Sequence, residues 1–149
     1  MKRHSALHSL SHDHHQGLIL AQQLKKGAPQ YKGMPKTLEE KRHYTISFFD
    51  SDLKKHFSAE EEILFFFVQN KNTEIDNLIS EIIGEHRKME KLVDKIQITD
   101  ELENILDELG WLLESHISKE ERKLFMLIQD ILSGEELKDI KNRFNKKLD

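Results

Sequence analysis

Hydrophobic residues recur three or four positions apart along most of the chain, which is the period of an α-helix with one buried face. No segment of the sequence sustains the alternation of apolar and polar residues that is typical of a strand. Polar or glycine-containing breaks separate the periodic segments, and both prolines fall within residues 27–35, which we expect to be a loop. The pattern predicts helices at about 11–27, 37–69, 74–97, 100–132 and 134–147.

Four long helices with short connections predict an all-α fold, an up-down-up-down four-helix bundle with a short fifth C-terminal helix. We expect residues 1–149 to form a single domain. The fifth helix is predicted to cap the end of the bundle because it has one apolar stripe. That stripe consists of Leu137, Ile140, Phe144 and Leu148.

Side chains that can accept hydrogen bonds from free backbone N–H groups mark several predicted helix starts. The pairs Thr37 with Glu40 and Ser133 with Glu136 have the spacing of a capping box. Ser11 is placed to be a simple N-cap of the first helix. These positions support the predicted boundaries at the start of three helices.

Composition and charge exclude several classes of function. The formal net charge of −4 gives no electrostatic case for binding nucleic acid or an anionic membrane. The absence of cysteine excludes a disulfide framework, a thiolate zinc site, an iron–sulfur cluster and a cysteine nucleophile. The longest apolar run, residues 63–68, is far shorter than the roughly 20 residues of a membrane span. We see no secretory signal and expect a cytoplasmic protein.

The nine histidines are an unusually high number for this length, and three of them lie at the centre of an apolar helix stripe. His56, His86 and His116 have leucine, isoleucine, methionine, valine or phenylalanine at helical spacing before and after them. In the first helix, His14 lies on the stripe, whereas His15 lies about 100° away from it. We expect His14 to point inward and keep His15 as the alternative.

These four inward histidines are also predicted to lie at one depth in the bundle. Residues on neighbouring antiparallel helices are level when they are equally far from the turn between them. The midpoints of the pairs His14/His56, His56/His86 and His86/His116 are positions 35, 71 and 101. Each midpoint falls in or beside a predicted turn, and His86 lies roughly 22 Å from either of its turns.

Two glutamates follow these histidines by one helical turn, within a repeated sequence. The frame His-x-Ser-x-Glu-Glu-x-x-Leu-Phe occurs at residues 56–65 and 116–125, and its first glutamates are Glu60 and Glu120. A buried carboxylate is costly unless it is paired or binds a metal. Nitrogen and oxygen donors from a helical bundle suit iron, then manganese or zinc, and two carboxylates able to bridge suit a dinuclear site. We expect the adjacent Glu61 and Glu62 to form a solvated face.

This ordered set of residues resembles the hemerythrin-like, or HHE cation-binding, domain family. The resemblance covers about residues 7–130, and the Leu-Ser-His-Asp-His-His segment at 10–15 and the Leu-Phe pairs that end both frames agree with it. It implies a non-haem di-iron centre, two iron ions (Fe2+/Fe3+) with an oxo or hydroxo bridge. In this interpretation His14 and His56 hold one iron, His86 and His116 hold the other, and Glu60 and Glu120 bridge them.

One departure from the family concerns the position one turn after His86. The oxygen-carrying members have a fifth histidine there, whereas this chain has Glu90. Glu90 either ligates the second iron as a carboxylate or is a charged residue at the edge of the stripe. An anion in place of a neutral imidazole stabilises ferric iron, so the resemblance favours sensing, detoxification or iron handling over reversible oxygen carriage.

The resemblance therefore implies a di-iron protein that binds or senses a small ligand, either O2, NO or peroxide. With six or seven protein ligands for two irons, at least one coordination position is expected to stay open for that ligand. Two alternatives remain, a di-iron oxidase or peroxidase, and a module for iron storage or for repair of iron centres. No catalytic acid, base or substrate pocket stands out in the sequence, so the question of enzymatic activity stays open.

Overall fold

The computed structural model describes the backbone of residues 2–148 and the side chains of residues 2–147, and it is helical with no strand in this part of the chain. Two of the predicted helices are built of several segments that follow one another without a turn, so that each forms one long rod. The elements are η1 (Ser5–Leu7), α1 (His8–Leu24), α2 (Leu38–Phe48), η2 (Phe49–Leu53), α3 (Lys54–Ala59), η3 (Glu60–Phe65), α4 (Phe66–Val68), α5 (Thr73–Ile96), α6 (Leu102–Lys119), η4 (Glu120–Leu124), α7 (Phe125–Ile131) and α8 (Gly134–Leu148).

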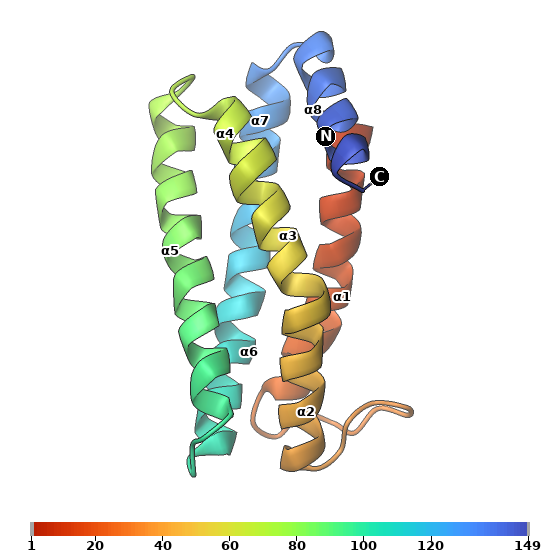
Figure 1. Ribbon diagram of the computed structural model, residues 1–149, viewed down its shortest axis with the longest axis vertical. Helices are drawn as coiled ribbons and strands as arrows, with labels where there is room; N and C mark the ends of the chain where they lie inside the picture. Colours follow the sequence, from red (N-terminus) through yellow and green to blue (C-terminus); the bar gives the residue numbers. More distant parts are fainter. Residues whose placement is uncertain (1, 149) are drawn as a thin grey trace.

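The four rods of the bundle are α1, the run from α2 to α4, α5, and the run from α6 to α7. Figure 1 shows how they lie side by side. From the upper right, α1 descends to the loop at the lower end, and the rod from α2 to α4 ascends across the front. Next, α5 descends on the left and the rod from α6 to α7 ascends behind, after which α8 packs beside the upper part of α1. The predicted helical bundle is confirmed.

The first helix is shifted relative to its prediction, and the N-cap assigned to Ser11 is wrong. A 3₁₀ turn, η1, precedes α1, and His4 Nδ1 accepts a hydrogen bond from the backbone N–H of Ala6 (3.0 Å) at its start. Ser11 lies inside α1, where its hydroxyl donates to Glu121 Oε2 (3.0 Å). The helix ends at Leu24, three residues early, ahead of a turn in which Gly27 has a φ of +72°.

The predicted capping boxes are present, one of them in altered form. At the start of α8, the Glu136 N–H donates to Ser133 Oγ (3.1 Å), and the Ser133 N–H donates to Glu136 Oε1 (3.0 Å). At the start of α2, the Glu40 N–H donates to Thr37 Oγ1 (3.1 Å), but the Glu40 carboxylate accepts from the Lys36 N–H. Both arrangements satisfy N–H groups that the helix leaves without partners.

The buried apolar residues form two separate clusters, one at each end of the rods. The upper cluster includes Leu64 and Phe125, and it contains the apolar side of α8 with Leu137, Ile140 and Phe144. The short helix therefore caps the bundle as predicted, although the side chain of Leu148 lies outside the described residues. The lower cluster includes Leu92, Leu113 and their neighbours on α1 and η2. The buried histidines and glutamates lie at the level between these two clusters.

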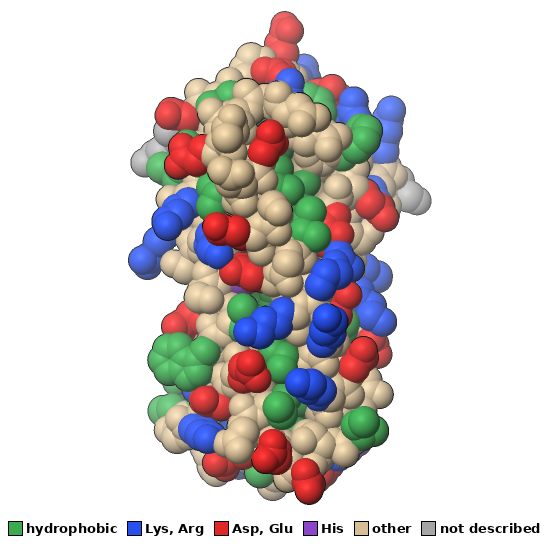
Figure 2. All heavy atoms as spheres, turned by 90° about the vertical axis from the view of Figure 1, so that its left-hand side faces the viewer, with side chains coloured by type: hydrophobic (Ala, Val, Ile, Leu, Met, Phe, Trp, Pro, Cys, Tyr) green, Lys and Arg blue, Asp and Glu red, His purple; other side chains and the backbone are tan. Residues whose placement is uncertain are grey.

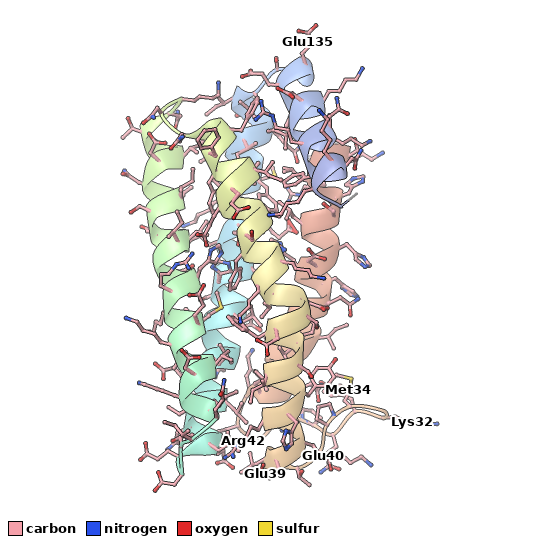
Figure 3. The ribbon with its side chains drawn as sticks, viewed as in Figure 1. Lys32, Met34, Glu39, Glu40, Arg42 and Glu135 are labelled. Atoms are coloured by element: carbon pink, nitrogen blue, oxygen red, sulfur yellow. The ribbon has the colours of Figure 1, made fainter. Side chains whose placement is uncertain are left out.

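The lower end of the bundle is closed by polar contacts. Figure 3 shows Arg42 on α2 beside Glu39, with Lys32 and Met34 in the loop that projects away from the helices. Arg42 Nη1 lies 3.5 Å from Glu39 Oε1, and Arg42 Nη2 donates to the carbonyl of Thr99 (3.4 Å) in the turn after α5. This contact ties the start of α2 to the α5–α6 connection.

The outer face over α5 is mixed in character. Figure 2 shows acidic and basic side chains interspersed on it, with hydrophobic side chains in small groups and hardly any histidine in view. Among the described residues, no helix combines the length and the apolar character needed to span a membrane.

Candidate metal centre

Six polar side chains are buried together at the level between the two apolar clusters. Each has at most 4% of its surface exposed, and they come from all four rods. His15, the alternative to His14 on α1, is exposed. The six residues are His14, His56, Glu60, His86, His116 and Glu120.

The two glutamates lie between pairs of histidines. Glu60 Oε1 is 3.2 Å from His56 Nε2 and 3.2 Å from His86 Nε2. Glu120 Oε1 is 2.6 Å from His116 Nε2 and 3.7 Å from His14 Nε2. Each carboxylate therefore joins histidines from two different rods.

The donor atoms form two adjoining groups of four. One group combines His14 and His56 with both glutamates, and the other combines His86 and His116 with the same glutamates. Within each group, the donor atoms all lie within 4.8 Å of one another. This grouping, with two histidines and two shared carboxylates in each set, is the one that the resemblance implies.

Both copies of the repeated sequence frame adopt the same local structure. Glu60 begins the π-helical segment η3, and Glu120 begins the π-helical segment η4. A π-helical turn is wider than an α-helical one and is frequently found at functional sites. In each frame the histidine lies in the last turn of the preceding α-helix, so histidine and glutamate meet where the helix widens.

The buried donors fit a metal because the protein leaves them without hydrogen bonds. In the part of the chain that the structure describes, Nε2 of all four histidines and all four carboxylate oxygens of Glu60 and Glu120 are buried without a hydrogen-bond partner. Native proteins rarely leave buried polar atoms unsatisfied, and a buried carboxylate needs a cation. The nitrogen and oxygen donors are those that iron, manganese and zinc accept.

The pKa values of buried histidines and of Glu60 also indicate that the site needs a cation. Burial lowers the pKa of His56, but the charge of Glu60 and the hydrogen bond to Asp13 outweigh it and raise this pKa to about 9. Burial opposes the ionisation of Glu60, yet His56 and His86 hold its pKa well below the usual range. Burial lowers the pKa of His116, which stays neutral. The Glu60 carboxylate therefore requires a positive charge beside it.

The second ring nitrogen of each histidine, Nδ1, faces a carboxylate. Three of these contacts are hydrogen bonds, and the fourth is a close approach whose alignment falls short of one. Burial opposes ionisation of Glu85, but hydrogen bonds from His116 and Lys119 lower its pKa. The distances are 3.0 Å from His56 to Asp13, 2.7 Å from His86 to Glu61, 2.8 Å from His116 to Glu85, and 3.2 Å from His14 to Glu121.

All four of these partners correct or extend the sequence interpretation. The expectation that Glu61 is part of a solvated face is wrong, because only 23% of its side chain is exposed and it bonds to His86. Glu62 is exposed as expected and pairs with Lys147 (2.9 Å). Sequence reasoning did not single out Asp13, Glu85 or Glu121, although each directly neighbours a predicted ligand in the sequence.

Aromatic rings cover the histidines on two sides, and the sequence analysis missed them too. The ring of Phe57 stacks on that of His86 with 3.9 Å between centroids, and Phe125 stacks on His14 at 5.5 Å. Phe57 directly follows His56, and Phe125 ends the second repeated frame. Their position next to the candidate ligands is the signal that was available in the sequence.

Glu90 is not brought into the cluster. Its half-buried carboxylate accepts hydrogen bonds from the exposed Arg87, with Arg87 Nη1 at 2.9 Å from Oε1. The inward position in this turn of α5 is occupied by Met89, which is fully buried. Of the two interpretations of Glu90, the structure favours a charged residue at the edge of the stripe.

The chain matches a known protein family. The model of a protein family described as hemerythrin HHE cation-binding domain matches residues 5–128. No curated protein and no solved structure matches the chain. The matched segment includes all six buried donors and all four carboxylates that face Nδ1.

Proposed function

The chain belongs to the hemerythrin HHE cation-binding domain family, and from that premise we propose that it is a non-haem di-iron protein that binds or senses O2, NO or peroxide. The family supports cation binding in general, and the buried histidines and glutamates support its location. We take the four rods to be the up-down-up-down bundle in which such a centre lies between facing helices.

The observation that carries the proposal is the sharing of Glu60 and Glu120 between two groups of donors. A mononuclear site needs one set of three or four ligands around one point. Here four histidines divide into two pairs, and each pair reaches the same two carboxylates. We therefore propose two ions, with the carboxylates spanning them.

Iron is the metal we propose because the donors are imidazole and carboxylate without thiolate. Manganese or zinc can take the same donors and are the expected substitutes. Carboxylates and neutral imidazoles both persist when iron changes between Fe2+ and Fe3+, so one ligand set serves both states. When bound, iron supplies the redox chemistry and the affinity for diatomic ligands that the side chains lack.

The proposed small ligand follows from the surroundings of the donors. Two imidazoles and two carboxylate oxygens per ion leave positions free on a metal that accepts six ligands. The donors are nearly inaccessible to solvent and lie between two apolar clusters, with Phe57 and Phe125 against the imidazole rings. Such a site admits a molecule of a few atoms and excludes a larger substrate.

The proposal is tested by loading the protein with Fe2+ without oxygen and adding O2, NO or hydrogen peroxide separately. We expect new charge-transfer absorption with at least one of the three, reversed when that ligand is removed. Protein without iron is the control and should show no change. Sustained consumption of peroxide would contradict a binding or sensing role, and an unchanged spectrum with all three ligands would contradict the proposed site chemistry.

A further inference from the structure

The four carboxylates that face Nδ1 form a closed ring around the bundle. Each one extends from its own rod to the histidine of the rod that comes next in the chain, and the last returns to the first. Asp13 on α1 reaches the second rod, Glu61 reaches α5, Glu85 reaches α6, and Glu121 on η4 reaches α1. We call these four residues the carboxylate ring.

Every member of the carboxylate ring directly neighbours a donor of the metal centre in the sequence. Asp13 and Glu85 precede His14 and His86, while Glu61 and Glu121 follow Glu60 and Glu120. One residue along a helix is a rotation of about 100°, so a neighbour of an inward residue lies at the helix edge, opposite the adjacent rod. Each rod therefore contributes an inward donor and an edge carboxylate from the same turn.

An ionised carboxylate only accepts hydrogen bonds, so the Nδ1 that bonds to it in His56, His86 and His116 must carry the proton. The 3.2 Å approach of Glu121 to His14 Nδ1 favours the same arrangement there. In a neutral imidazole the other nitrogen, Nε2, then presents its lone pair, and Nε2 is the atom directed at Glu60 and Glu120. This inference rests on the proposed function. We propose that the carboxylate ring positions the four imidazoles and keeps the proton on Nδ1, so that Nε2 is available to the metal. Its members are positioning residues that do not touch the metal.

Three members of the carboxylate ring are themselves held by a cation. Lys119 Nζ lies 2.7 Å from Glu85, Arg3 Nη2 lies 3.1 Å from Glu121, and Arg87 contacts Glu61. The side chains of these three carboxylates are only 19–23% exposed. The cations hold these carboxylates in place, as the positioning role requires.

Asp13 is the exception. Its side chain is 49% exposed, and among the described residues its one ion-pair partner is His56. It borders a groove of about 860 Å³ between α1, the second rod and α8, which is lined by His56, Lys55 and Phe144 among others. The Asp13–His56 pair is therefore the part of the carboxylate ring that solvent reaches most easily.

The inference is tested with four isosteric variants, Asp13→Asn, Glu61→Gln, Glu85→Gln and Glu121→Gln. The matched control is Glu62→Gln, which changes a carboxylate on the same segment as Glu61 that is exposed and pairs with Lys147. Co2+ is the probe, and its affinity is measured by competition with a chelator. We expect each of the four variants to lose about 10- to 100-fold in affinity and the control to stay within about twofold.

A second measurement distinguishes positioning from a general effect on folding. In the Co2+-loaded protein, the Nδ1 protons of ligating histidines give paramagnetically shifted proton resonances that disappear in D2O. We expect four such resonances, each variant of the carboxylate ring broadening or shifting mainly one of them. The His56 proton is expected to exchange fastest, because Asp13 is the most exposed member.

The outcomes separate this inference from the proposed function. Tight Co2+ binding that the four variants weaken no more than Glu62→Gln would overturn the inference while leaving the proposed function intact. Four resonances that all change equally in every variant would also overturn it, because the effect would then be global. If the unaltered protein bound no Co2+, both the proposed function and the inference would be wrong.

Discussion

A close approach between α1 and α6 gives a sharp test of the packing that aligns the metal centre. A Cβ atom added at Gly110 would lie 2.8 Å from the carbonyl oxygen of Ala21 and 3.1 Å from Leu24 Cβ. Ordinary contact begins at 3.4 Å, so the two helices would have to separate by about 0.6 Å. These helices carry His14 and His116, and their spacing sets how far apart those ligands lie.

The expected effect of Gly110→Ala on the free energy of unfolding is the balance of two opposing contributions. Overpacking against a rigid backbone costs about 1–3 kcal/mol, while alanine in place of glycine within a helix gains about 1 kcal/mol. Gly84→Ala is the matched control, because it lies inside α5 and a Cβ there meets nothing within 4 Å. The control retains the gain without the cost, so the two variants should differ by about 1–3 kcal/mol.

Thermal unfolding of the metal-free variants measures this difference. For a protein of this size, 1 kcal/mol corresponds to roughly 2–4 °C in Tm. We expect Gly84→Ala to raise Tm by that amount and Gly110→Ala to fall roughly 2–12 °C below it. If Gly110→Ala stabilised the protein as much as Gly84→Ala, the close packing of α1 on α6 would be refuted.

Three further predictions address the ligands, their protonation and a helix end. His86→Ala should lose bound metal and His15→Ala should retain it, measured by elemental analysis after gel filtration; equal retention would contradict the ligand set. Because the pKa of His56 is raised to about 9, its ring is protonated at neutral pH and metal must displace that proton. Metal affinity should therefore fall about tenfold per pH unit from about pH 8 to 6, whereas a constant affinity in calorimetric titrations would refute the displacement. Ser133→Ala removes the cap of α8 and should lower unfolding stability by about 1 kcal/mol in urea titrations, where no change would exclude a stabilising cap.

The depth of the metal centre was predictable because it depends on regular geometry. The helical rise is constant, so residues equally far from a turn meet at one level whichever side chains lie between them. The prediction for the third helix, 74–97, matches α5 at Thr73–Ile96 closely, since its apolar period is long and uninterrupted. The six buried donors follow from this period and from the repeated frame.

The contacts made by side chains at the edges of the helices were not predictable in the same way. Glu61 and Glu90 both lie beside an apolar stripe, and the sequence does not say which neighbouring side chain each will meet. Glu61 meets His86 of the next rod, while Glu90 meets Arg87 on its own helix. The difference depends on how the rods are rotated against one another, which only the packed structure specifies.

Two local features of the helices could not be predicted from the sequence for the same reason. Ser11 has the oxygen chemistry of an N-cap, but a hydroxyl suits an interhelical hydrogen bond equally well, and its partner Glu121 lies 110 positions away in the sequence. The π-helical turns that begin at Glu60 and Glu120 share the sequence pattern of an α-helix. Their wider turns reflect packing at the centre of the bundle rather than a local propensity.

The most direct test of the account is a titration of metal-free protein with Fe2+ in the absence of oxygen. Bound iron is counted per chain after gel filtration, with Glu60→Gln and Glu120→Gln measured alongside. We predict that the unaltered protein takes up two equivalents and that both variants take up fewer, because each carboxylate belongs to both groups of donors. Saturation at one equivalent, or no uptake at all, would contradict a dinuclear centre.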